Sequence, residues 1–147
     1  MLIQIILGIF VASFLEWFAH KYILHVLGRK KASLFSFHWG KHHAAARRNG
    51  FLDPLVSARE AFGIIFLCVV FTPVILFAPF AYGTMFVHAV LYFILHNAAH
   101  KYPEFAKKYM PWHYDHHMGK NQNMNWCVVH PLADYLLGTR RKYEYRK

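Results

Sequence analysis

Residues 61–100 read AFGIIFLCVVFTPVILFAPFAYGTMFVHAVLYFILHNAAH, a run of 40 residues without one Asp, Glu, Lys or Arg. At about 1.5 Å per helical residue, this run makes about 60 Å of helix, enough for two crossings of a hydrocarbon core about 30 Å thick. Pro79 and Gly83 predict a turn over residues 79–83, so we expect a helical hairpin with legs at 61–78 and 84–100. Pro73 lies inside the first leg and should kink it.

The N-terminal stretch predicts a third membrane helix. Residues 1–15 contain no charged side chain, and the apolar pattern continues to about residue 27. A signal peptide would need a basic start and a small-residue cleavage site, and the stretch has neither. We therefore expect a retained helix that is longer than one crossing, projects into solvent and stops at Gly28.

The basic residues indicate how these helices are oriented. Seventeen Lys and Arg against seven Asp and Glu give a net charge of +10. Eight of the 17 lie within 21–59 and nine within 101–147, whereas the N-terminus and the turn at 79–83 have none. Three crossings place both basic segments on one side, which the positive-inside rule makes cytoplasmic. The charge is thus a topology signal with some attraction for anionic lipids, and no nucleic-acid partner is expected.

Together these patterns predict an all-α integral membrane protein with about three transmembrane helices and a cytoplasmic histidine-rich helical cap. Residues 1–147 should form a single membrane-embedded domain. The 56% hydrophobic content and the long charge-free runs exclude an ordinary soluble domain, a disordered chain and a disulfide-rich secreted scaffold.

Histidine is the most unusual feature of the composition, with 12 residues against seven carboxylates. Ten of them fall in four clusters, each at the cytoplasmic end of a predicted span or in a cytoplasmic segment. The topology alone therefore gathers them near one membrane surface. The clusters are His20 and His25; His38, His42 and His43; His96 and His100; and His113, His116 and His117.

The spacing within the clusters suits metal binding. On an α-helix, residues four apart differ by about 40° and residues three apart by about 60°. A common face is therefore predicted for His38 and His42, for His96 and His100, and for His113, His116 and His117. His20 and His25 are five apart and diverge by about 140°, so they must reach around a ligand or approach different metals. Neutral imidazoles bind Fe, Zn, Cu and Ni well. Ten imidazoles shared by two metals give five each, which leaves one octahedral position open for chemistry.

The few carboxylates are better suited to supporting the ligands than to binding metal. Soluble di-iron bundles use Glu and a Glu-x-x-His pattern. Glu60 and Glu104 lack that spacing, so the ligand set must be nearly all histidine. Glu16 lies one turn before His20, and Asp115 lies inside the last cluster. We expect both carboxylates to accept a hydrogen bond from an imidazole N–H and so to orient it.

In chain order the clusters read EWFAHKYILH, HWGKHH, HNAAH and HYDHH, and NMNWCVVHPLADYLLGT follows with Asn125, Asp134, Gly138 and Thr139. These motifs resemble those of the fatty acid hydroxylase / sterol desaturase superfamily of integral-membrane histidine-cluster oxygenases. The resemblance covers roughly residues 14–141. Fatty acid 2-hydroxylase-like members look most similar, and carotenoid hydroxylases are a near alternative. The chain departs from the pattern in having three spans, where relatives commonly have four or more, and no fused cytochrome b5-like domain.

The resemblance implies a di-iron oxygenase that hydroxylates a C–H bond of a fatty acyl chain or fatty-acid-containing lipid. It would use O2 and electrons from a separate donor of the ferredoxin or cytochrome b5 type. Zinc could replace iron in a recombinant preparation, because it binds such ligands more tightly. The alternatives are a carotenoid or sterol hydroxylase or desaturase of the same superfamily, and a non-catalytic membrane metal-binding protein. The implied ligands are His20, His25, His38, His42, His43, His96, His100, His113, His116 and His117.

Asp134 and two isolated histidines complete the set of candidate residues. Asp134 is expected to support the site or the fold, and it follows His130 by four residues, so the two can hydrogen-bond. His130 fits no cluster and is not expected to bind metal. His88 lies eight residues before His96, about 12 Å deeper in the membrane and too far to join the metal site. It either bonds a neighbouring helix or faces an internal cavity that receives the acyl chain.

Overall fold

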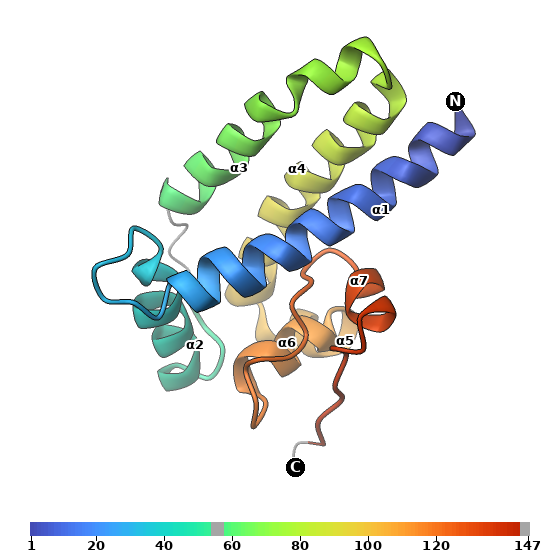
Figure 1. Ribbon diagram of the computed structural model, residues 1–147. Helices are drawn as coiled ribbons and strands as arrows, with labels where there is room; N and C mark the ends of the chain where they lie inside the picture. The colour runs from blue at the N-terminus through green and yellow to red at the C-terminus, as the bar shows by residue number, and fades with distance from the viewer. Residues whose placement is uncertain (54–57, 145–147) are drawn as a thin grey trace.

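The computed structural model describes residues 1–53 and 58–144, and the regular secondary structure in these ranges is all helical. Long helices form a membrane part, and short helices form a cap at one end of it (Figure 1). The membrane part consists of α1 (Leu2–Phe18) with its π-helical continuation η1 (Ala19–Leu27), α3 (Ala58–Val70) with the 3-10 helix η3 (Thr72–Leu76), and α4 (Pro79–Lys101). The cap consists of the π-helix η2 (His38–His43), α2 (Ala44–Arg48), α5 (Pro103–Tyr109), α6 (Pro111–Met118) and α7 (Leu132–Leu136).

Among the described residues, three helical segments are long and apolar enough to cross a membrane, which confirms the predicted number of spans. They are Leu2–Leu27, Ala58–Leu76 and Pro79–Lys101. The outer face of α3 is fully available to lipid, because none of its residues is buried and Phe62 and Ile65 are 70% and 61% exposed. Large apolar side chains on helices of this length are stable in a bilayer rather than in water. The chain is therefore an integral membrane protein.

The hairpin between α3 and α4 differs from the prediction in the position of its turn. The expected turn at 79–83 is helical: α4 begins at Pro79 and continues through Gly83, and the chain reverses just before it. Proline is favoured in the first turn of a helix, where its missing N–H would have no partner in any case. The predicted interruption of the other leg is present, since α3 ends before Pro73 and this residue lies in the first turn of η3.

A glycine allows α1 to pack tightly along α4. A Cβ atom added at Gly8 would lie 2.7 Å from the carbonyl oxygen of Ala81 and 2.8 Å from the Cβ of Thr84. Small residues at such contacts let membrane helices approach closely and gain van der Waals contact. Both helices run to the same end of the molecule, where the cap lies (Figure 1).

The cap is organised around a compact apolar core. This core joins the end of α4 to α5, α6 and the segment after α6, and its buried members are Phe51, Ala99, Ala106, Met110, Tyr114 and Val128. Because α4 and α6 both contribute to it, the histidines they carry are held in a fixed relation to each other.

Candidate metal centre

The structure brings the clustered histidines together at the junction of the membrane part and the cap. Nine of the ten form two groups, and within each group one nitrogen per residue lies within 4.8 Å of all the others. The five-histidine group consists of His20, His25, His38, His43 and His116. The four-histidine group consists of His42, His96, His100 and His117. The tenth histidine, His113, lies beside the second group, with its Nε2 atom 3.1 Å from that of His100.

Two π-helices explain how residues five apart can join one group. His20 and His25 lie on η1, and His38 and His43 lie on η2. In a π-helix the hydrogen bonds run from residue i to residue i+5, so residues five apart recur on the same side. The predicted divergence of His20 and His25 is therefore wrong. The common face predicted for His38 and His42 is wrong for the same reason, because η2 directs His42 to the other group.

Helix α6 contributes to both groups. His116 belongs to the five-histidine group and His117, the next residue, to the four-histidine group. Consecutive residues on a helix point in directions about 100° apart, so one helix placed between two sites can supply both. His96 and His100, one turn apart on α4, both serve the four-histidine group.

The spacing of the imidazole nitrogens fits metal ions. The Nε2 atoms of His25, His43 and His116 are separated by 3.0 Å, 3.2 Å and 3.2 Å. One proton can be shared by two nitrogens but not by three mutual neighbours, so hydrogen bonding alone leaves this triangle unsatisfied. Metal–nitrogen bonds of about 2.0–2.1 Å at right angles separate their nitrogens by about 2.9 Å. Both nitrogens of His117 are buried and lack a partner among the described residues. The donor set therefore fits a pair of metal ions.

Hydrogen bonds on the outer nitrogens orient the rings. When the Nδ1–H of an imidazole donates outward, its Nε2 lone pair points inward, which is the tautomer a metal ion needs. Five of the clustered histidines have such an outer partner. The Nδ1 atoms of His20, His100 and His116 bond the backbone carbonyls of Trp126, Phe51 and Met124, and those of His42 and His96 bond the carboxylates of Asp53 and Glu60.

The two supporting carboxylates were missed in the sequence. Asp53 lies 2.7 Å from His42, and Glu60 lies 2.9 Å from His96 and accepts a hydrogen bond from the Tyr92 hydroxyl at 2.7 Å. Both carboxylates bond the outer nitrogens of histidines in the four-histidine group. Sequence reasoning rejected Glu60 only as a direct ligand. One sequence feature could have indicated the role of Glu60. Tyr92 precedes His96 by four residues, so both side chains lie on the same face of α4, close to the end of the hairpin at which α3 and Glu60 begin.

The structure corrects the role predicted for Glu16. Its carboxylate accepts a hydrogen bond from the Nε2–H of His88 at 2.7 Å instead of orienting His20. It also accepts hydrogen bonds from the backbone N–H groups of Val128 and Val129. Glu16 thus ties α1 to α4 and to the segment before α7. The same contact identifies the polar partner of His88 inside the membrane part.

Asp115 and Asp134 also have structural partners. Asp115 forms an ion pair with Arg140, with 2.9 Å between Oδ2 and Nη1. The two carboxylate oxygens of Asp134 accept hydrogen bonds from the backbone N–H groups of Trp126 and the residue after it. Asp134 thereby fixes the segment whose carbonyl group orients His20. The expected bond to His130 is absent from the described structure, where His130 is exposed and lies outside both histidine groups.

Burial keeps the cap histidines neutral. Removal from water lowers their pKa well below the ordinary value of 6.5, and the positive charge that neighbouring imidazoles would carry lowers it further. For His42 the hydrogen bond from Nδ1–H to Asp53 opposes this effect, and its pKa is still lowered. Neutral imidazole is the form that binds a metal ion. The histidines with a strongly lowered pKa are His38, His43, His113, His116 and His117.

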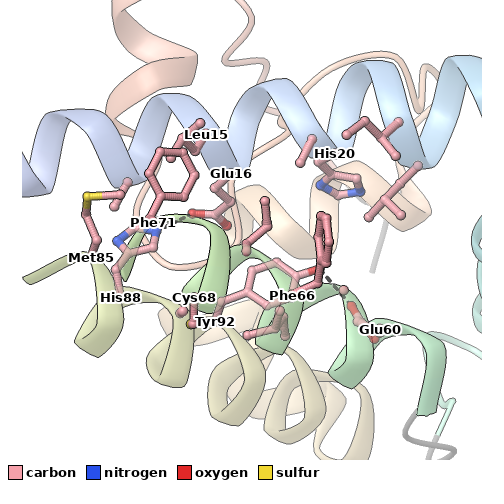
Figure 2. A pocket seen from close by; sticks show the side chains of 18 of the residues that line it. Leu15, Glu16, His20, Glu60, Phe66, Cys68, Phe71, Met85, His88 and Tyr92 are labelled. Atoms are coloured by element: carbon pink, nitrogen blue, oxygen red, sulfur yellow. Dashed lines mark hydrogen bonds and ion pairs between the residues drawn. The ribbon is translucent and has the colours of Figure 1, made fainter. Parts of the chain in front are cut away.

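An apolar cavity in the membrane part reaches the five-histidine group at His20. It has a volume of about 280 Å³ and lies between α1, α3 and α4. Figure 2 shows His20 and Glu60 at one end of it and Phe71, Met85 and His88 at the other. His20 belongs to the five-histidine group, and Glu60 is bonded to His96 of the other group. The end of the cavity at His20 and Glu60 is therefore the one nearer to the candidate metal centre, and we call it the metal end.

The protein-family model described as fatty acid hydroxylase matches residues 5–139 of this chain. Neither the curated proteins nor the solved structures contain a match to this chain. The matched stretch includes all ten clustered histidines and the residues that line the cavity. The buried imidazole groups, the three apolar spans and this match agree: the chain belongs to the fatty acid hydroxylase family.

Proposed function

We propose that this protein is a membrane-bound di-iron oxygenase that hydroxylates a C–H bond of an acyl lipid. The observation that carries the proposal is the apolar cavity in the membrane part, which ends at His20 of the five-histidine group and at Glu60, the carboxylate bonded to His96 of the four-histidine group. In the net reaction the C–H bond becomes C–OH, and the second oxygen atom of O2 leaves as water. Two electrons come from an external reductant, and two protons balance the charge.

The chain's own residues hold and tune the metals. The five-histidine group would hold one iron, and the four-histidine group together with His113 would hold the other. Iron bound in this way would supply reductive activation of dioxygen, which amino-acid side chains cannot perform. Asp53 and Glu60 make the imidazoles of the second group better electron donors by accepting their outer N–H bonds.

The cavity walls position the lipid and exclude water. Its volume of about 280 Å³ is close to the lower end of the 300–1,000 Å³ typical of small-molecule sites. A flexible acyl chain can adapt its shape to a small cavity, whereas the rigid rings of a sterol cannot. This favours the acyl-lipid substrate over the sterol alternative. The mostly apolar lining also keeps water away from the carbon that reacts.

The same proposal places the metal centre on the cytoplasmic side. Both basic segments flank the cap, and the positive-inside rule assigns such segments to the cytoplasm. A soluble or membrane-bound donor of the ferredoxin or cytochrome b5 type would deliver electrons there. Reporter fusions at residue 31 and in the turn before α4 test this orientation, and a cytoplasmic signal from the second fusion contradicts it.

The function is tested by untargeted lipid analysis of cells that express the chain. Cells with the wild-type protein should accumulate a hydroxylated lipid that is absent from cells with the His116→Ala variant. A non-catalytic metal-binding protein would retain metal in the purified wild-type protein and produce no new lipid in either culture. That result would replace the enzyme proposal with the metal-binding alternative.

A further inference from the structure

One cationic side chain lines the otherwise mostly apolar cavity. Among the described residues of the lining, Arg59 is the single Lys or Arg. Its guanidinium group lies 5.8 Å from the ring centre of Phe37, another lining residue. Within residues 1–53 and 58–144 it forms no ion pair with a carboxylate. An exposed arginine in this position has its charge available for a ligand.

Arg59 lies at the metal end of the cavity. It precedes Glu60 in the first turn of α3, and Glu60 lies with His20 at one end of the lining (Figure 2). The Glu60 carboxylate is bonded to His96 and to the Tyr92 hydroxyl, so it is committed to the metal centre. The opposite end has no cationic partner of this kind, because the His88 imidazole there is bonded to Glu16.

We propose that Arg59 binds the carboxylate of a fatty acid whose single chain occupies the cavity. Arginine recognises a carboxylate through two parallel N–H···O bonds, a geometry that lysine cannot reproduce. The positive end of the α3 dipole at the same turn adds a favourable interaction with an anion. A volume of about 280 Å³ suits one acyl chain better than two, which favours a fatty acid over a diacyl lipid. This inference rests on the proposed function and specifies its substrate.

The orientation of the substrate follows from the position of Arg59. With the carboxylate at Arg59, the carbons next to it lie beside His20 and Glu60, and the methyl end points toward Phe71 and Met85. The hydroxyl group is therefore introduced near the carboxylate and not near the methyl end. If the residue that binds the carboxylate lay at the opposite end of the cavity, the methyl end of the chain would be hydroxylated instead.

The test measures binding and does not depend on turnover. Full-length protein with its metals is titrated, in competition with a fluorescent fatty acid, with a saturated fatty acid and with the fatty alcohol and alkyl phosphate of the same chain length. Arg59→Gln should weaken binding of the fatty acid about tenfold or more and leave the alcohol unchanged, because only the anion loses a partner. Arg59→Lys should give an intermediate loss. Arg48→Gln on α2, an exposed arginine outside the cavity lining, should match the wild type.

Each other outcome overturns part of the account. Unchanged fatty-acid binding in Arg59→Gln, with normal metal content, overturns the anchor. A loss confined to the alkyl phosphate shows that the head group is a phosphate and not a carboxylate. Hydroxylation at the methyl end of the product overturns the orientation. If the charge-specific loss is observed and no hydroxylation occurs with iron and reductant, the anchor stands and the proposed function fails.

Discussion

The two histidine groups differ in the chemical nature of the groups that accept hydrogen bonds from their outer Nδ1–H atoms. In the five-histidine group, His20 and His116 donate to backbone carbonyl groups. In the four-histidine group, His42 and His96 donate to carboxylates. An anionic acceptor raises the basicity of the ring more than a neutral one does. Metal ions bound by the two groups would therefore be in chemically different positions, and the four-histidine group would be the more electron-rich.

Replacing one of these carboxylates should weaken metal binding. Glu60→Gln keeps the shape of the side chain and removes its charge, so the affinity of the four-histidine group should fall by about 10–100-fold. The matched control is Glu104→Gln, because the Glu104 side chain is 84% exposed and forms an ion pair with Lys107 at the surface. Metal titration of the two purified variants measures the difference. Equal metal affinities of the two variants would show that Glu60 does not support metal binding.

Loss of a buried ligand should have a larger effect. His117 is fully buried, and both its nitrogens lack a partner among the described residues. His117→Ala should abolish turnover and reduce the metal content, while the protein remains in the membrane because the three spans do not depend on it. His130→Ala, at an exposed histidine outside both groups, should behave like the wild type. Elemental analysis and product formation check this, and full turnover in His117→Ala would show that this residue is not a ligand.

At the scale of helices, hydropathy and charge were enough to predict the three spans and the approximate positions of the histidines. They could not predict the π-helices, because the α-helical spacing of 3.6 residues separates His20 from His25, and only the folded chain shows the wider turn. Asp53 and Glu60 also escaped prediction. Their roles depend on contacts with η2 and α4 across the fold, which no local spacing encodes.

The packing of α1 against α4 gives a prediction about two glycines. Gly8→Ala should destabilise the protein by about 1–3 kcal/mol, because the new methyl group would lie 2.7 Å from a backbone oxygen of α4. Gly83→Ala is the matched control, since its added Cβ meets no atom within 4 Å. Alanine favours the helix by up to about 1 kcal/mol there, so stability should stay equal or rise. Thermal unfolding in detergent, followed by circular dichroism, compares the two, and equal melting temperatures would exclude close packing at Gly8.

At the scale of the whole molecule, the buried histidines make stability depend on pH. In the cap, burial holds the pKa of residues such as His113 and His116 well below 6.5, the ordinary value that the unfolded chain restores. Above pH 6.5 both states are neutral, and the native state keeps its full stability. Below this pH the unfolded chain binds protons that the folded protein does not, so the free energy of unfolding falls. Protons also compete with bound metal for the same nitrogens, which acts in the same direction.

Acidification should therefore destabilise the protein steeply. Each such histidine removes about 1.4 kcal/mol of stability per pH unit between its unfolded and folded pKa values. The melting temperature should be clearly lower at about pH 5.5 than at about pH 7.5, with release of metal over the same interval. The His130→Ala variant, which lacks only an exposed imidazole, should show the same pH dependence. A melting temperature that is unchanged or higher in acid would mean that the histidines are not held neutral by burial.

The proposed function requires that the two buried imidazole groups, one of which reaches the apolar cavity at His20, form an oxygenase site for an acyl lipid. The most direct measurement is mass spectrometry of lipids incubated with the purified, iron-loaded protein, a chemical reductant and 18O2. We expect one 18O atom in the hydroxyl group of a fatty acyl product, and no labelled product with His116→Ala. An unlabelled hydroxyl group, or no product from a protein that carries two iron ions per chain, would contradict it.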